Sequence, residues 1–113
     1  MKVIDVYRQY FEAEATYNDV ARHAALVTLT ATSDNGTIKY EAGVSFFPHN
    51  DPTDFSVSYD AYLSKELYSG NGRRSKKREA ILLETFRAEA DELSETINGK
   101  IFWERPLREA AFG

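Results

Sequence analysis

The sequence predicts a two-layer α+β fold. A three-stranded antiparallel sheet, with a fourth short edge strand as an option, is expected to pack against an N-terminal helix and a long C-terminal helix in the order α-β-β-β-α. Apolar residues recur at helical spacing over residues 76–98, and they alternate with polar residues on both sides of Asn35-Gly36. With 113 residues, 42% of them hydrophobic, residues 1–113 are expected to form a single domain.

The N-terminal segment, residues 3–15, is predicted to be a helix. Ile4, Tyr7, Phe11 and Ala15 would share one helical face. A strand is the alternative, because β-forming residues are frequent in this segment and also alternate. One more helical turn is expected over residues 20–25, before the sheet begins.

A β-hairpin is predicted over residues 25–47. Asp34-Asn35-Gly36 is typical of a two-residue type I′ turn. A turn at Asn35-Gly36 places apolar residues opposite one another: Ala31 with Tyr40, Leu29 with Ala42, Val27 with Val44 and Ala25 with Phe46. Because a one-residue slip would reverse the face of every side chain, this agreement predicts the register as well as the hairpin.

Two further extended segments follow from apolar patterning. Residues 55–63 alternate and are predicted to form the third strand. Residues 100–104 are expected to form either an edge strand or a strap over the core, which Pro106 would end. Residues 107–113 are expected to be a loose tail.

The long helix is predicted over residues 76–98. Its buried stripe would consist of Leu82, Phe86, Ala90, Leu93 and Ile97. Ser75 is a suitable N-cap, and Asn98-Gly99 is a suitable end, because both residues tolerate the left-handed conformation.

A basic run precedes this helix in the predicted loop over residues 69–78. Five cations lie here: Arg73, Arg74, Lys76, Lys77 and Arg78. Positive charge at a helix N-terminus opposes the macrodipole, so stability alone would not favour this order. We therefore expect Arg73–Arg78, with Ser75, to bind an anion such as a phosphate. The alternative is a solvated basic loop that only favours solubility.

The predicted element order and this loop resemble the double-stranded RNA-binding domain. In that family a glycine-containing loop and a Ser-Lys-Lys run open the last helix and contact phosphates. The resemblance implies phosphate contacts by Ser75, Lys76 and Lys77 and packing of Ala80 near the helix start. It covers about a dozen residues. Ile81, Leu82 and Leu83 depart from the family's alanine-rich surface, so the chain is not assigned to it.

Several classes of function lack support in the sequence. There is no cysteine, which excludes disulfides and thiolate metal sites, and no residues assemble a catalytic group, so the chain is expected not to be an enzyme and to need no cofactor. His49, Asp51 and Asp54 are too few for a metal signature and are typical of a turn. No segment has the length of a membrane span, and a cytoplasmic location is expected.

Three functions remain. The first is a non-catalytic module that contacts nucleic-acid phosphates, although the formal net charge of −4 opposes extensive wrapping of nucleic acid. The second is an acidic protein-interaction or inhibitor module of the mobile-element or immunity type. It would use Glu84, Asp91, Glu92, Glu95, Tyr62, Phe47 and Trp103. The third is a self-associating structural subunit that dimerises through an edge strand, over residues 55–63 or 100–104.

Overall fold

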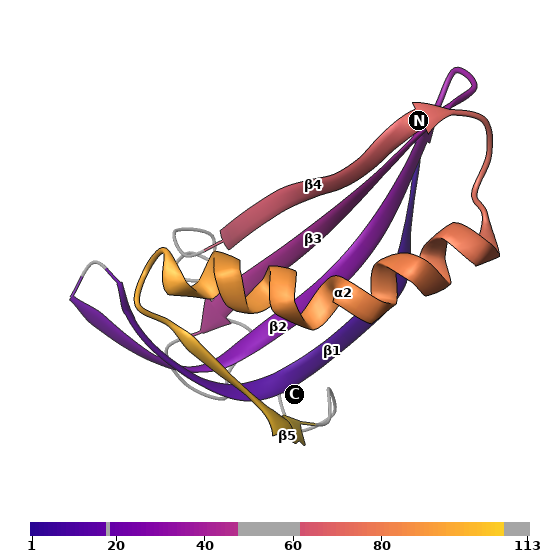
Figure 1. The fold of residues 1–113 in the computed structure, drawn as a ribbon. Coiled ribbons are helices and arrows are strands. Elements are labelled where there is room, and N and C mark those ends of the chain that lie inside the picture. The colour runs from indigo at the N-terminus through magenta and orange to yellow at the C-terminus, as the bar shows by residue number, and fades with distance from the viewer. Residues whose placement is uncertain (18, 48–61, 108–113) are drawn as a thin grey trace.

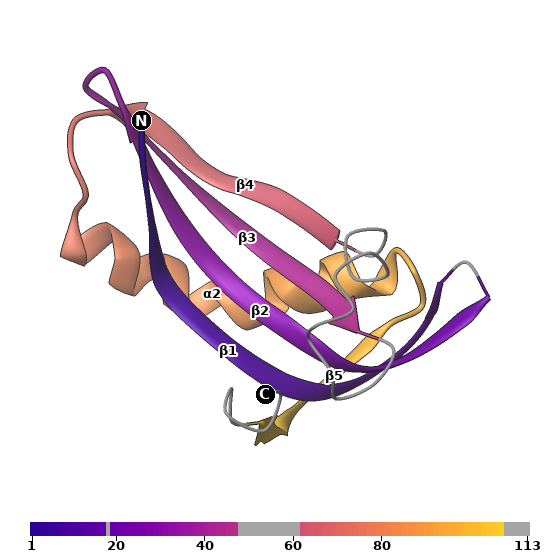
Figure 2. The ribbon, with the colours of Figure 1, turned by 180° about the vertical axis from the view of Figure 1, so that it is seen from behind.

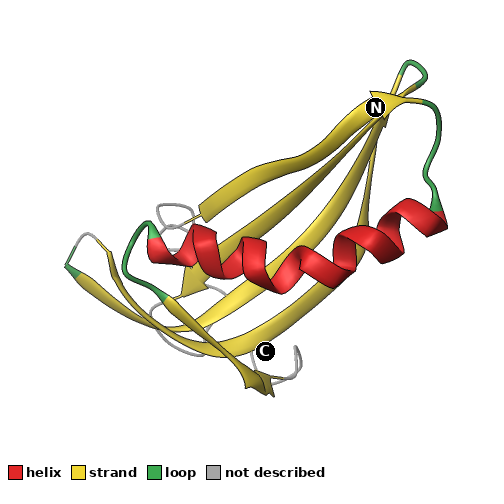
Figure 3. Ribbon diagram, viewed as in Figure 1, coloured by secondary structure: helices red, strands yellow, loops and turns green. Residues whose placement is uncertain are grey.

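The computed structural model describes residues 1–17, 19–47 and 62–107. Its elements follow the order β1 (Lys2–Tyr17), β2 (Val20–Asp34), β3 (Thr37–Phe47), β4 (Tyr62–Asn71), α2 (Lys76–Glu95) and β5 (Lys100–Leu107). The five strands form one antiparallel sheet in the order β4-β3-β2-β1-β5. The sheet is curved, and α2 lies across its concave face (Figures 1 and 3). Seen from behind, the strands lie in front of the helix (Figure 2).

The predicted order α-β-β-β-α is therefore wrong. The described part of the chain has five strands and one helix, and the segment predicted as the N-terminal helix is strand β1. Residues 20–25, where a further helical turn was expected, begin β2. The topology that suggested a resemblance to the double-stranded RNA-binding domain is absent.

A β-bulge explains the helical appearance of residues 3–15. The register of β1 on β2 shifts between Asp5 and Tyr7, and again between Glu12 and Ala15. The first shift inserts one extra residue into β1, so the positions that face the core change there from even to odd. Ile4 and Tyr7 consequently face the same side at a spacing of three, as they would in a helix. The spacing of this segment is that of an irregular strand.

The hairpin prediction is confirmed, with its register. In the structure Ala31 pairs with Tyr40, Leu29 with Ala42, Val27 with Val44 and Ala25 with Phe46. Asn35 and Gly36 both have positive φ, at 50° and 79°, as a type I′ turn requires. Of the predicted third strand, residues 55–61 lie outside the described residues, while Tyr62 and Leu63 belong to β4.

Helix α2 begins where the sequence predicts and ends three residues earlier. Ser75 is the N-cap, and its side chain accepts a hydrogen bond from the Arg78 amide. The last helical residue is Glu95, not Asn98. Asn98 has a φ of 55° and reverses the chain toward β5.

Strand β5 is an edge strand that continues past the predicted stop. It pairs with β1, with Ile101 opposite Ala13 and Pro106 opposite Phe11. Proline lacks an amide donor but is tolerated on an edge strand. Leu107, predicted to start a loose tail, pairs with Tyr10. Residues 108–113 lie outside the described residues.

The core lies between the concave face and α2. Side chains of β1, β2, β3, α2 and β5 contribute, and Leu29, Val44 and Phe46 are fully buried there. From the helix, Phe86 and Ala90 insert into this cluster, and Phe86 meets Tyr7 edge to face with 5.2 Å between ring centroids. A smaller cluster of Tyr10, Ala24 and Phe47 is separate from this core.

Candidate functional site

The basic run of the sequence, residues 73–78, lies at the corner where β4 leads into α2. We call residues 73–78 the basic corner. Ser69–Asn71, predicted as part of its loop, are the last residues of β4, so the connection is only residues 72–75. The Gly72 amide donates a 2.7 Å hydrogen bond to the Gly36 carbonyl, which ties the loop to the tip of the β2–β3 hairpin. The corner is therefore anchored to the sheet at its start.

A buried carboxylate anchors the corner at its other end. Glu79, in the first turn of α2, is buried and accepts two hydrogen bonds of 2.9 Å from the Arg74 guanidinium, one from Nε and one from an Nη. Tyr40 of β3 donates a 2.8 Å hydrogen bond to the same carboxylate and accepts one from the Ser75 amide. Sheet, loop and helix thus meet at one carboxylate.

The electrostatics of this cluster follow from these contacts. The hydrogen bonds from Arg74 are the main reason that the pKa of Glu79 lies below its usual value, and they act against the effect of burial. The same contact raises the pKa of Arg74. Burial raises the pKa of the Tyr40 hydroxyl, which therefore stays protonated as a donor. All three groups keep the charge state that the hydrogen bonds need.

Arg78 is also used within the fold. Its guanidinium carbon lies 4.0 Å from the centroid of the Tyr68 ring, within the range of a cation–π contact. Tyr68 in turn lies beside Tyr40, with 6.3 Å between ring centroids. Two of the five predicted phosphate ligands, Arg74 and Arg78, therefore fix the corner.

The other three cations point to solvent. Arg73, Lys76 and Lys77 are exposed, and they form no hydrogen bond or ion pair with another described residue. Lys76 acts at longer range and lowers the pKa of Glu79. The Ser75 hydroxyl is occupied by its capping hydrogen bond. The structure thus gathers three free cations on an ordered corner.

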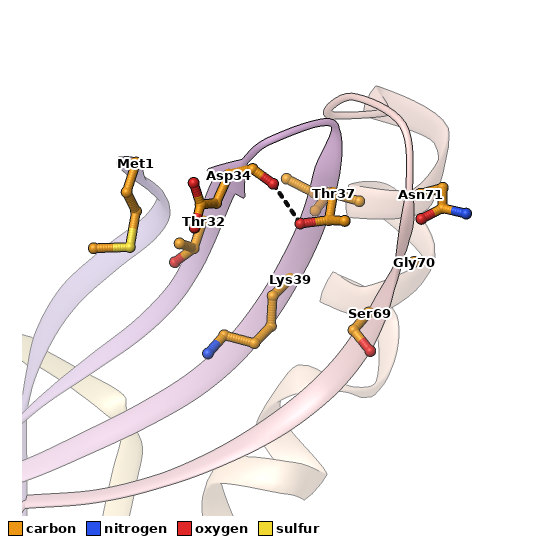
Figure 4. Close-up of a pocket in the computed structure, with 9 residues that line it drawn as sticks. Met1, Thr32, Asp34, Thr37, Lys39, Ser69, Gly70 and Asn71 are labelled. Atoms are coloured by element: carbon orange, nitrogen blue, oxygen red, sulfur yellow. Dashed lines mark hydrogen bonds between the residues drawn. The ribbon is translucent and has the colours of Figure 1, made fainter.

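A shallow pocket of about 430 Å³ lies at the same end of the sheet (Figure 4). Its wall includes polar side chains from three strands: Thr32 and Asp34 of β2, Thr37 and Lys39 of β3, and Ser69 and Asn71 of β4. Asn71 directly precedes the corner loop. Sequence reasoning missed this pocket because it assigned residues 69–71 to a loop instead of to the strand that forms one wall.

Three of the predicted protein-interface residues lie together elsewhere. Asp91, Glu95 and Trp103 line a groove of about 610 Å³ between the C-terminal half of α2 and β5. The Trp103 indole N–H donates a 2.9 Å hydrogen bond to Asp91, and its ring meets Phe11 edge to face at 4.9 Å. Arg87 lies 5.2 Å from the Trp103 ring.

The remaining predicted interface residues are dispersed. Glu92 lies 3.6 Å from Lys65 of β4, and Glu84 is exposed on the helix. The ring of Tyr62 lies against Gly43 on the face of the sheet opposite α2, where it is 53% exposed. Phe47, expected as an exposed anchor, is buried. These residues do not form one surface.

No group of three or more His, Cys, Asp or Glu residues within residues 1–17, 19–47 and 62–107 could hold a metal ion. His23 is exposed on β2, and His49, Asp51 and Asp54 lie outside the described residues. The helix that the structure describes lacks the apolar length needed to cross a membrane.

The chain was also compared with known proteins. Protein-family models, curated proteins and solved structures all returned no match.

Proposed function

We propose that this chain is a non-catalytic binding module that contacts nucleic-acid phosphates through Arg73, Lys76 and Lys77. The observation that supports it is that only two of the five cations at the basic corner contact other side chains of the described fold. Arg74 and Arg78 are held by Glu79 and Tyr68, while the other three cations are exposed and have no partner among the described residues. Cations that no described residue engages are available to an external anion.

The order of the corner supports the same proposal. Phosphate binding is stronger when the cations need not be ordered at the moment of binding. The Gly72 hydrogen bond fixes the loop to the hairpin, and the Arg74 hydrogen bond fixes it to the helix. Ser75, at the end of the loop, is the N-cap of the helix. Contacts of this kind position a protein on nucleic acid without reading its sequence.

The salt dependence of binding tests the proposal. Three phosphate contacts on duplex DNA give a slope of log K against log salt of about −2.7, at about 0.9 per phosphate. We expect this slope in titrations of a labelled duplex between about 50 and 200 mM salt. A slope near zero contradicts the proposal.

A charge-matched pair of variants makes the test specific. Replacing Arg73, Lys76 and Lys77 together by alanine should abolish binding. Replacing Lys2, Lys100 and Arg105 by alanine changes the net charge equally and should leave most of the binding intact. Equal losses in the two variants would show that only overall charge matters and would refute a site at the corner.

The groove beside β5 supports a second candidate function, binding of a basic protein segment. Three carboxylates line it, those of Asp91, Glu95 and Glu104, with the aromatic residues Phe102 and Trp103 and two cations, Lys100 and Arg105. Aromatic anchors with carboxylates at the rim suit a lysine- or arginine-rich chain. Trp103 is the single tryptophan of the sequence, so its fluorescence reports on this groove directly.

A peptide titration tests this candidate. An arginine-rich peptide should change Trp103 emission at low salt, and Glu95→Gln should weaken the effect. Glu84→Gln, the same change on an exposed helix position away from the groove, is the control. An unchanged emission with the peptide in excess would exclude the groove as its site.

A further inference from the structure

Two rows of polar side chains build the pocket at the hairpin end of the sheet, and each row crosses β2, β3 and β4. The first row consists of Thr32, Lys39 and Ser69, and the second consists of Asp34, Thr37 and Asn71. Residues two apart on a strand share a face, so both rows lie on one face of the sheet. This face is opposite α2, because Ala31 and Tyr40, which adjoin Thr32 and Lys39 along the chain, are in the core beneath the helix.

The pocket adjoins the basic corner. The Gly72 amide donates a hydrogen bond to the Gly36 carbonyl. The chain neighbours of these two glycines, Asn71 and Thr37, pair with each other and line the pocket. Arg73 is two residues beyond Asn71, so their Cα atoms are at most about 7 Å apart. A nucleic-acid strand bound at Arg73 can therefore place a neighbouring nucleotide at the pocket.

The charge of the pocket does not suit a phosphate. The Asp34 carboxylate lines the pocket and forms no ion pair with another described residue. The cation of the pocket, Lys39, lies 3.2 Å from a carboxylate oxygen of Glu41. The unpaired charge that remains is negative, and it repels an anion.

The lining suits hydroxyl groups instead. An ionised carboxylate only accepts hydrogen bonds, whereas the hydroxyls of Thr32 and Ser69 donate and accept them. Thr32 and Asp34 lie side by side on β2 (Figure 4). These three side chains form no hydrogen bond with another described residue. No aromatic ring is present among the described lining residues, so the pocket offers no surface on which a base could stack.

We propose that this pocket binds the ribose of an RNA whose phosphates are held at the basic corner. The inference rests on the proposed function and names RNA as its ligand. The sugar–phosphate backbone of DNA presents only acceptors, which the Asp34 carboxylate cannot engage. The 2′-hydroxyl of RNA is both a donor and an acceptor, and in an RNA duplex it lies in the wide, shallow minor groove. At the pocket it donates to Asp34 and accepts from Thr32.

Three duplexes of the same sequence test the proposal: RNA, DNA, and RNA in which fluorine replaces each 2′-hydroxyl. The fluorinated duplex keeps the A-form helix and lacks the donor. We expect the parent chain to bind RNA about tenfold more tightly than the fluorinated duplex, the low end of what a hydrogen bond to a charged group contributes. Equal affinities for these two duplexes overturn the proposal, and this comparison needs no variant.

A matched pair of variants assigns the preference to Asp34. Asp34→Asn should remove most of it, because a neutral acceptor replaces a charged one. Asparagine is also favoured at the first position of a turn, so the hairpin should be retained. Asp19→Asn makes the same charge change at an exposed position between β1 and β2, at the other end of the sheet, and should leave the ratio of the two affinities unchanged. An equal effect of both variants, or no effect of either, refutes the role of Asp34.

Salt dependence separates this inference from the proposed function. The loss of affinity with salt reports the phosphates at the corner, whereas RNA and its fluorinated analogue carry the same phosphates. A slope near zero with all three duplexes refutes the proposed function and the ribose site with it. A slope near that expected for the corner, with RNA and the fluorinated duplex bound equally, refutes the ribose site alone.

Discussion

Arg74 and Glu79 form a two-point ion pair across the start of α2, with guanidinium nitrogens 2.9 Å from each carboxylate oxygen. The Glu79 side chain is 9% exposed, whereas that of Arg74 is 39% exposed. The buried member also accepts the Tyr40 hydrogen bond, so the pair joins the helix to β3. Its position explains how five cations can surround the start of a helix: one of them neutralises an acidic residue in the first turn.

Glu79→Gln should destabilise the fold and loosen the corner. The substitution removes the charge that Arg74 and Tyr40 both contact, and a hydrogen bond to a charged group contributes about 1.5–3 kcal/mol. Because Arg74 is partly solvated, we expect a loss at the lower end of this range. Urea unfolding measures it. Glu84→Gln, on the exposed face of α2, should change stability by less than about 0.5 kcal/mol; equal effects would contradict the role of Glu79.

Acid should destabilise the protein through the same residue. The pKa of Glu79 is lowered in the fold from about 4.5, so the unfolded chain takes up this proton at a higher pH than the folded one. Its stabilising contribution is therefore complete above about pH 4.5 and is lost as the pH falls through the folded pKa. Urea midpoints of the parent chain and of Glu79→Gln should converge as the pH is lowered. A constant difference between them at all pH values would exclude this linkage.

Gly99→Ala should destabilise the protein by about 1–3 kcal/mol through overpacking. A methyl group there would lie 2.9 Å from the ring of the fully buried Phe46 and 3.1 Å from the Ser94 carbonyl oxygen. Neither neighbour can move freely. Gly43→Ala is the comparison, because its nearest atoms are side-chain ends of Thr28 and the exposed Tyr62, so its cost should be smaller. Thermal unfolding distinguishes the two, and an unchanged midpoint for Gly99→Ala would refute the close packing.

The sequence was sufficient to predict the hairpin and its register because two independent constraints agree there. The Asn35-Gly36 turn fixes the pairing, and every core-facing pair that follows from it is apolar. Residues 3–15 lack such a constraint. The bulge at Val6 adds one residue to the alternation of side chains along the strand. The apolar residues on the core face are therefore spaced as they would be over two turns of a helix.

The basic corner shows the corresponding limit for a site. The sequence places the cations on both sides of a helix N-cap, and the structure confirms Ser75 in that role. The sequence does not show which of the cations contact other residues of the fold. Glu79, one residue after the basic run, was the available signal, but its contact with Tyr40 depends on tertiary packing between β3 and α2. Only the structure separates Arg74 and Arg78 from the three free cations.

Asp91→Ala should loosen β5 where it meets the helix. The change removes the acceptor of the 2.9 Å hydrogen bond from Trp103, while the edge-to-face contact of Trp103 with Phe11 remains. The freed indole N–H can bind water because Trp103 is only partly buried, so we expect a loss of about 1 kcal/mol and no unfolding. Fluorescence measures the effect without a label, since Trp103 is the single tryptophan, and its emission should shift to longer wavelength. Glu95→Ala in the same groove should leave the emission unchanged. A shift of equal size in both variants would mean that the groove responds to charge and that the hydrogen bond does not hold β5.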